Sequence, residues 1–179
     1  MKVLTIENKK EEKFLRKKAA DFDFSTLSTS SGLKFTKKEL NRLTKDMRET
    51  MKEEIGIGLS ANQVGLDMQL FVAEIPLEDR TMKFYSIFNP KITKTSKETS
   101  ILEEGCLSVP GFYGTVERPA KITLEGFDKN GRKVKIKAAG LTARVFQHEV
   151  DHLNGILFID KAKNVQKVSE EEKSEIKPV

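Results

Sequence analysis

The chain has 179 residues, 37% of them hydrophobic, which is enough for one compact domain with a buried core. Its 32 basic and 27 acidic residues are scattered, and there is no tryptophan or basic–aromatic stripe, so a nucleic-acid-binding protein is disfavoured. No apolar run is long enough to span a bilayer and no hydrophobic signal segment stands at the amino terminus, so we expect a cytoplasmic protein with no membrane or DNA partner.

The first strongly patterned segment is a helix in the first third of the chain. Residues 25–36 are rich in serine and threonine and are expected to form a surface loop. Thr36 and Glu39 have the spacing of a capping box at a helix start. Four apolar residues follow at three- and four-residue spacing: Leu40, Leu43, Met47 and Met51. This pattern predicts a helix over Lys37–Glu54 with one buried stripe, ended by a loop at Gly56–Gly58.

Strand-like segments fill the middle of the chain. Five segments have strand composition: Gln69–Ile75, Phe84–Phe88, Lys91–Thr95, Ala120–Phe127 and Val134–Ala138. Asp128–Gly131 supplies a hairpin turn between the last two of them. A helix, several antiparallel strands and a second helix indicate an α+β domain. Residues 162–179 are highly charged and are expected to form a loose helix or a disordered tail.

The second helix carries a metal-binding motif. The only two histidines, His148 and His152, stand four residues apart in the pattern H-E-x-x-H. On a helix they lie on one face, so both rings can bind one metal ion, and Glu149 can take a proton from water bound to it. Thr142 is the expected N-cap and Asn154–Gly155 the expected stop. A chance match on a polar helix face is the alternative, and the presence of both histidines in one motif argues against it.

A catalytic metal site usually takes three protein ligands, so one ligand is missing from this motif. In one class of metallopeptidase the third ligand is a histidine at the position of Phe158, which cannot bind metal. In another class it is a glutamate about twenty residues downstream, which falls on Glu170–Glu172. These glutamates stand in a charged segment that is poorly suited to hold a ligand rigidly. A peptidase with Glu172 as third ligand is the enzyme alternative.

Cys106 is the better candidate for the third ligand. It is the only cysteine in the chain, so no internal disulfide can form. Taken alone, it would more often be a small buried hydrophobic residue. Gly105 beside it permits close approach of the backbone. With the two histidines, a Cys106 thiolate makes a three-ligand site with one open coordination position.

Three segments together resemble the signature motifs of the peptide deformylase family. Gly56–Gln63 resembles G-x-G-L-A-A-x-Q, with Ser60 in place of the usual first alanine. Glu104–Ser108 matches E-G-C-L-S, and Gln147–Leu153 matches Q-H-E-x-D-H-L. The motifs have the right order and separation, and the resemblance extends from Lys37 to Lys161. The change to Ser60 keeps a small residue.

The resemblance implies a fold and a reaction. The fold is α+β, with antiparallel sheets packed around a central helix carrying H-E-x-x-H and one further amphipathic helix nearer the amino terminus. The reaction is removal of the formyl group from the N-terminal formylmethionine of newly made polypeptides, releasing formate. The metal is held by Cys106, His148 and His152, and ferrous iron is the physiological ion. Zinc, nickel and cobalt also suit these ligands, and any of them can occupy the site in purified protein.

Site roles follow from the same resemblance. Glu149 is the general base and acid. The side-chain amide of Gln63 and the backbone N–H of Leu107 stabilise the developing oxyanion. Five residues are expected to contact substrate: Ile57, Gly58, Gly105, Leu141 and Val145. From the residue types, Gly58 lets the substrate backbone lie alongside as an added strand, while Ile57, Leu141 and Val145 are candidates for the methionine pocket. Because helical spacing puts Leu141 and Val145 just before His148, core packing is the alternative for both.

The expected partners are formylmethionyl nascent polypeptides, with the ribosome near its exit tunnel as a second candidate. We expect a monomer with one catalytic domain over residues 1–161, followed by the tail. From a different class of function, a non-catalytic metal-binding module on the ribosome is the alternative. Glu149 and Gln63 argue against that alternative, because a protein that only binds metal needs neither.

Overall fold

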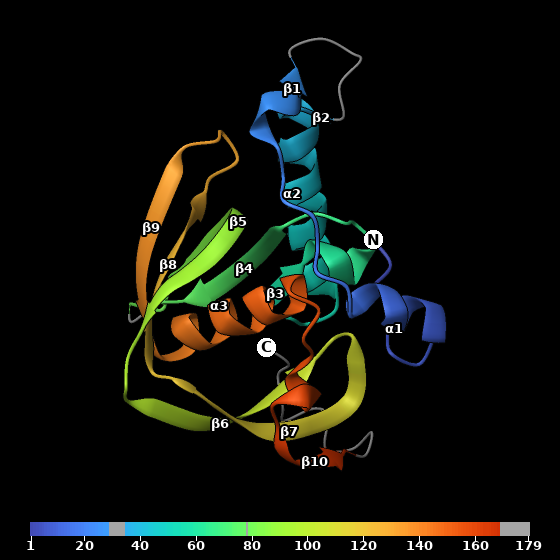
Figure 1. Ribbon diagram of the computed structural model, residues 1–179, viewed down its shortest axis with the longest axis vertical. Helices are drawn as coiled ribbons and strands as arrows, with labels where there is room; N and C mark the ends of the chain where they lie inside the picture. The colour runs from blue at the N-terminus through green and yellow to red at the C-terminus, as the bar shows by residue number, and fades with distance from the viewer. Residues whose placement is uncertain (29–34, 78, 169–179) are drawn as a thin grey trace.

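The computed structural model describes residues 1–28, 35–77 and 79–168, and its ribbon is drawn in Figure 1. The α-helices of this part are α1 (Lys9–Leu15), α2 (Lys37–Glu53) and α3 (Gly140–Leu153). Short 3-10 turns are η1 (Phe24–Thr26), η2 (Ala61–Val64) and η3 (Phe158–Asp160). None of the helices in the described residues is long and apolar enough to cross a membrane.

Two antiparallel sheets form the framework of the domain. The larger has the order β3-β4-β5-β8-β9, built from β3 (Gly58–Ser60), β4 (Leu70–Pro76), β5 (Met82–Thr95), β8 (Lys121–Phe127) and β9 (Lys133–Ala139). The smaller has the order β10-β7-β6, built from β6 (Thr99–Cys106), β7 (Val109–Pro119) and β10 (Lys163–Lys167). A short parallel pair joins β1 (Leu27–Ser28) to β2 (Phe35–Thr36).

Helix α3 lies between the two sheets (Figure 1). One core cluster joins the five-stranded sheet to α3 and includes Phe71, Leu124, Val145 and Phe146. A second cluster joins α2 to the other side of β3 and β4. A third, around Cys106 and Phe158, lies at the three-stranded sheet. The helix that carries both histidines is therefore held from two sides, and Phe158 is a core residue rather than a ligand.

Helix α2 confirms the pattern seen in the sequence. It begins at Lys37 and ends at Glu53, and Thr36 forms a capping box with Glu39. Leu40, Met47 and Met51 are buried on one face, as their spacing predicts. The Asp128–Gly131 turn also joins β8 to β9 as expected, with Gly131 at φ +75°. The α+β architecture with antiparallel sheets is confirmed.

The predicted start of the motif helix was wrong. Helix α3 begins at Gly140, with Ala139 as N-cap, and not after Thr142. Strand β9 ends at Ala139, so the chain must turn into the helix within one residue. Gly140 makes that turn with φ +56°, a conformation that glycine adopts without the steric cost of a side chain. At the other end, Asn154 is the C-cap and Gly155 has φ +76°, as expected.

Several strands differ from the sequence prediction. The segments predicted as Phe84–Phe88 and Lys91–Thr95 are one strand, β5, whose pairing with β8 shifts register between Phe88 and Lys91. This bulge accommodates Asn89 and Pro90 within the strand. Gly58, predicted in a loop, starts β3 and pairs with Ala73. Strand β7 was not predicted, because its prolines and glycines disfavour strands and only pairing with two neighbours stabilises it.

The two flanking segments also differ from expectation. Lys163–Lys167, expected as a loose helix or disordered chain, is strand β10 and pairs antiparallel with β7. All five of its residues are exposed, so the strand forms through backbone pairing that residue composition does not reveal. The rest of the tail, 169–179, lies outside the described residues, as does 29–34 within the predicted 25–36 loop. In the described ends of that loop lie η1, β1 and β2.

Candidate metal centre and active site

Three buried ligand atoms meet between α3 and the end of β6. His152 Nε2 lies 3.1 Å from Cys106 Sγ and 3.2 Å from His148 Nε2. The ligand atoms of all three residues lie within 4.8 Å of one another. The histidines come together because they are one helical turn apart, and Cys106 reaches them because β6 ends against α3. The structure therefore brings together the ligand set predicted from the sequence.

These residues fit a metal ion. Ligand atoms bound tetrahedrally at about 2.0–2.3 Å from an ion lie about 3.3–3.8 Å apart. The distances of 3.1 and 3.2 Å from His152 Nε2 to the other two ligands are slightly shorter than this. Burial lowers the pKa of His148, but contacts with Cys106 and Glu104 outweigh it and raise the pKa to about 10. Metal binding at this site must therefore displace a proton and is expected to weaken as the pH falls.

Glu104 fixes the orientation of His148. Its Oε2 lies 3.1 Å from His148 Nδ1, so a neutral ring that donates from Nδ1 directs a free Nε2 toward Cys106. Arg118 binds the Glu104 carboxylate with two hydrogen bonds of 2.6 and 2.9 Å. Arg144 adds a third, of 2.6 Å. Burial alone raises the pKa of Glu104, but hydrogen bonds from Arg118 and His148 outweigh it and hold the pKa well below its usual range.

Asp151 extends this ionic network to the surface. It accepts hydrogen bonds from Arg118 Nη1 at 2.7 Å and from Lys161 Nζ at 2.6 and 2.7 Å. Its side chain is only 14% exposed, so it is a partner of Arg118 rather than a free helix residue. Arg144 points to Glu104, Ser100 and the Val116 carbonyl. Both arginines thus support the carboxylate that orients His148.

Glu149 is buried between α3 and β3. Its Oε2 accepts a hydrogen bond of 2.6 Å from Ser60 Oγ, whereas its Oε1 is buried without a hydrogen-bond partner in the described residues. A β-carbon on Gly58 would overlap Oε1, so only glycine leaves the carboxylate room at this point. Burial raises the pKa of Glu149 to about 7, although the nearby His148 and the Ser60 hydrogen bond oppose that rise. A carboxylate with such a pKa can both accept and return a proton near neutral pH.

Gln63 lies on the other side of the cysteine. The Ser60 backbone N–H donates to Gln63 Oε1 at 2.8 Å, which turns the amide nitrogen toward the site. Gln63 Nε2 lies 3.2 Å from Ser108 Oγ and 3.7 Å from Cys106 Sγ. Leu107 follows the cysteine directly, and its side chain packs over Gly56. The structure therefore brings Gln63 and Leu107 to the same place as the three ligands.

The predicted substrate residues do not all lie together. Val145 is fully buried and lies beside Gly58, and Ile57 packs against the same core cluster. Leu141, in contrast, is 40% exposed and lines a separate hollow of about 560 Å³ with Pro76 and Leu77. A β-carbon on Gly105 would overlap the ring of Tyr113, so this glycine admits a neighbouring side chain of the protein.

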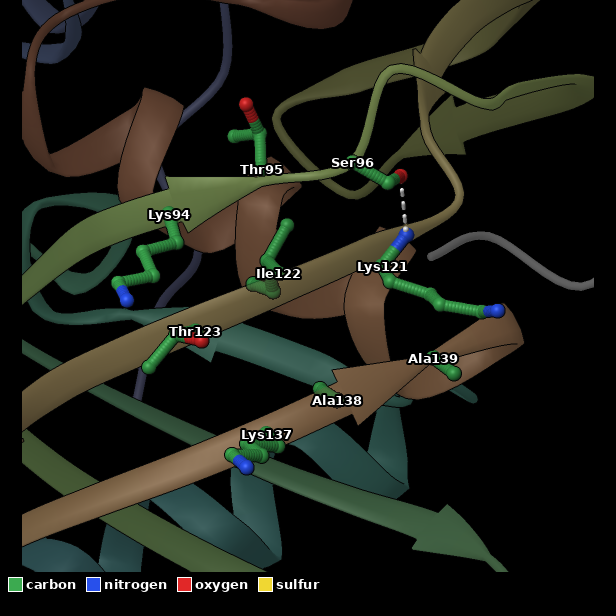
Figure 2. A pocket seen from close by; sticks show the side chains of 9 residues that line it. All are labelled: Lys94, Thr95, Ser96, Lys121, Ile122, Thr123, Lys137, Ala138 and Ala139. Atoms are coloured by element: carbon green, nitrogen blue, oxygen red, sulfur yellow. Dashed lines mark hydrogen bonds between the residues drawn. The ribbon is translucent and has the colours of Figure 1, made fainter.

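A second hollow lies away from the metal ligands. It measures about 360 Å³ and is lined by Lys94, Lys121 and Lys137 among other residues of β5, β8 and β9 (Figure 2). No residue predicted for catalysis or metal binding lines it. The candidate metal ligands and Glu149 therefore lie together, where the ends of β3 and β6 meet α3.

Sequence reasoning missed three contributors to the site. Ser60 was interpreted only as a small residue, yet its hydroxyl contacts Glu149. Ser108 Oγ accepts a hydrogen bond from the Gln63 amide, and the ring of Tyr113 packs against Gly105. Both serines stand inside the matched motifs, and this position was the sequence feature that could have identified them as site residues. Nothing in the sequence pairs Tyr113 with Gly105, because the pairing depends on the β6–β7 register.

A buried Cys-His-His set beside a buried glutamate on this α+β framework defines a metal-dependent hydrolase. A model of the family described as polypeptide deformylase matches residues 3–168. The chain is 47% identical over 122 residues to the peptide deformylase of Rhizobium meliloti, covering 68% of this chain and 70% of that protein. It is 43% identical over 146 residues to that of Synechocystis sp., covering 78% of each. The chain belongs to the polypeptide deformylase family and is an enzyme of that class.

Solved structures agree with this assignment. A probable peptide deformylase from Synechococcus phage S-SSM7 has a TM-score of 0.76 and 39% identity, over 90% of this chain and 99% of that one. A peptide deformylase from Synechococcus elongatus in complex with actinonin has a TM-score of 0.74 and 35% identity, over 92% and 79%. The peptide-deformylase-like fold expected from the three motifs is confirmed.

Proposed function

We propose that this chain removes the formyl group from N-terminal formylmethionine of newly made polypeptides, at one divalent metal ion held by Cys106, His148 and His152. One observation carries the proposal. The three ligand atoms lie within 4.8 Å of one another, and one oxygen of the neighbouring Glu149 carboxylate has no hydrogen-bond partner among the residues that the structure describes. A metal ion held by these residues would polarise the formyl oxygen and lower the pKa of water. Ferrous iron is the ion we propose, and zinc, nickel and cobalt suit the same donors.

Glu149 would move the proton in this reaction. Its unpartnered Oε1 takes the proton from the attacking water and then delivers it to the departing amide nitrogen. Water addition and cleavage of the C–N bond thus produce formate and a free amino terminus. The enclosed position of Glu149, only 1% exposed, keeps bulk water from competing for that proton.

Gln63 and Leu107 would stabilise the charge that develops on the formyl oxygen. The Gln63 amide is already oriented by Ser60 and Ser108, so little reorganisation is needed in the transition state. The backbone N–H of Leu107 would provide the second donor. Removing one donor of this kind typically slows turnover by about a hundredfold to a thousandfold.

Substrate contacts would lie along β3 and the start of α3. Gly58 and Gly105 would contact the substrate backbone, and Ile57 and Val145 would contact an apolar first side chain; the position of Gly58 beside Val145 and Glu149 supports this. Leu141 stays part of the proposal as one helical turn before Val145, although its exposed side chain lines the separate hollow with Pro76 and Leu77. The remaining proposals are a single catalytic domain over residues 1–161, a monomer in the cytoplasm, and the ribosome near its exit tunnel as a partner.

The decisive experiment is an anaerobic assay on the peptide formyl-Met-Ala-Ser. Metal-free protein is reloaded separately with ferrous iron, zinc, nickel and cobalt, and formate and free amino termini are measured. We expect stoichiometric formate in at least the iron form. Absence of formate in every form, with one metal bound per chain, would overturn the proposal.

The two alternatives are less well supported. Cys106 has its ligand atom within 4.8 Å of those of both histidines, which supports it as the third ligand in place of Glu172. Glu170–Glu172 lie outside the described residues and carry no argument. A non-catalytic metal-binding module would not need a buried glutamate beside the metal ligands with one oxygen that has no hydrogen-bond partner among the described residues. The family relationship favours the deformylase over both.

A further inference from the structure

Ser60 stands where the first family motif usually has alanine, and its hydroxyl reaches the reacting carboxylate. Ser60 Oγ lies 2.6 Å from Glu149 Oε2 and 3.0 Å from the Glu149 backbone oxygen. A hydroxyl has one hydrogen to donate, and 2.6 Å is typical of a hydroxyl that donates to a charged carboxylate. Ser60 is fully buried and Glu149 is 1% exposed, so water cannot replace this bond.

The Ser60 hydroxyl is itself held in place. Ser60 is the last residue of β3 and pairs with Phe71 of β4. Its backbone N–H donates to Gln63 Oε1 at 2.8 Å. One residue therefore connects the carboxylate of Glu149 and the amide of Gln63, which lie on different elements of the fold. A shift of Ser60 would move both groups.

The hydrogen bond from Ser60 also gives the two carboxylate oxygens of Glu149 different roles. The last torsion of a glutamate side chain is broad and nearly two-fold, so a free carboxylate can rotate and exchange its oxygens. Ser60 binds Oε2, while Oε1 lies beside Gly58 and has no hydrogen-bond partner in the described part of the chain. The oxygen that handles the proton is then always the same one.

We propose that Ser60 is a positioning residue for the deformylase reaction: its hydroxyl holds Oε2 of Glu149 so that Oε1 faces the attacking water. This inference rests on the proposed function. Ser60 keeps its own proton throughout, and only Oε1 exchanges a proton with the reactants. Loss of the hydroxyl should therefore lower kcat and leave the binding of substrate, product and metal unchanged.

The test combines Ser60→Ala with a double-variant cycle. On formyl-Met-Ala-Ser, S60A should lower kcat about 10-fold, equal to about 1.4 kcal/mol, with KM changed less than about twofold. Metal content and the Kd of the product Met-Ala-Ser, measured by calorimetry, should match the wild type. In a Glu149→Ala background, adding S60A should change the residual rate less than about twofold, because the positioned group is gone.

Controls separate positioning from general damage. Thr44→Val removes another buried hydroxyl, one that bonds only within α2, and should leave kcat unchanged. Ser60→Cys keeps a similar side-chain volume but has a weaker hydrogen-bond donor, so its kcat should lie between those of the wild type and S60A. If S60A fails to fold, Ser60→Cys provides the test of the hydroxyl instead. A wild-type kcat in S60A, or equal losses with and without Glu149, would overturn the inference. A wild type that releases no formate would instead overturn the proposed function.

Discussion

Glu104 Oε2 lies 3.1 Å from His148 Nδ1, while the other ring nitrogen, Nε2, lies 3.2 Å from His152 Nε2. The contact joins β6 to α3 and couples the orientation of a metal ligand to a carboxylate held by Arg118 and Arg144. Such outer contacts fix the ring and raise the basicity of the ligand, and their loss typically weakens metal binding 10- to 100-fold.

Glu104→Gln should therefore weaken metal binding by about 10- to 100-fold without removing a ligand. The neutral amide can still contact His148, but it no longer neutralises the two arginines. The affinity is measured by competition with a chelator at constant pH. Glu125→Gln, which alters an exposed glutamate paired with Lys135, is the matched control. An affinity within twofold of the wild type would show that the carboxylate does not tune the site.

Glu149→Ala should retain one metal per chain and lose most of the turnover, because the ligands remain and the proton carrier is gone. General acid–base catalysis contributes about 100- to 10,000-fold, which sets the expected loss. Elemental analysis and formate release on the same preparation check both parts. Near wild-type turnover in the iron form would contradict the assignment of Glu149.

Glu74→Gln should lower the stability of the fold at neutral pH. Glu74 is buried on β4 and pairs with Arg48 and Lys52 of α2. The Arg48 hydrogen bond lowers its pKa, against the effect of burial. This contribution is complete above the ordinary glutamate pKa and is lost as the pH falls through the lowered one. In urea unfolding, the free energy of unfolding of the variant should be about 1–3 kcal/mol lower than that of the wild type at pH 7. This difference should become smaller below about pH 4.

Truncation should separate the tail from the strand that precedes it. Ending the chain after Val168 should leave metal content and turnover unchanged, because every proposed site residue precedes that point. Ending it after Lys161 removes β10 and its pairing with β7, which should cost about 1–2 kcal/mol and lower Tm by about 3–6 °C. Calorimetry on both forms provides the measurement. Equal Tm values would show that β10 adds no stability.

The substrate should need both the formyl group and a long apolar first side chain. An acetyl methyl group should crowd a site built around the formyl hydrogen, so acetyl-Met peptides should react far more slowly. An apolar pocket discriminates by about 1–3 kcal/mol per methylene, so formyl-norleucine should be accepted and formyl-glycine disfavoured. Values of kcat/KM on one metal form provide the comparison. Equal values for formyl and acetyl peptides would indicate a broader amidase.

The sequence alone determined the features that depend on local spacing. Helix α2 was predictable because its capping box and apolar stripe involve residues three and four positions apart. For the same reason His148 and His152 could be placed on one face of a helix. Cys106 was identified by elimination, since no other thiol exists, and the three motifs then identified the family.

Tertiary structure alone decided the contacts between residues far apart in the chain. Ser60 and Glu149 are 89 positions apart, and Glu104 and Arg144 are 40 apart. Strand β7 contains prolines and glycines, which disfavour strands, and every residue of β10 is exposed. Both strands are stabilised by pairing with their neighbours. Helix periodicity is contained in neighbouring residues, whereas strand pairing and buried hydrogen bonds depend on which distant partner the fold brings within about 3 Å.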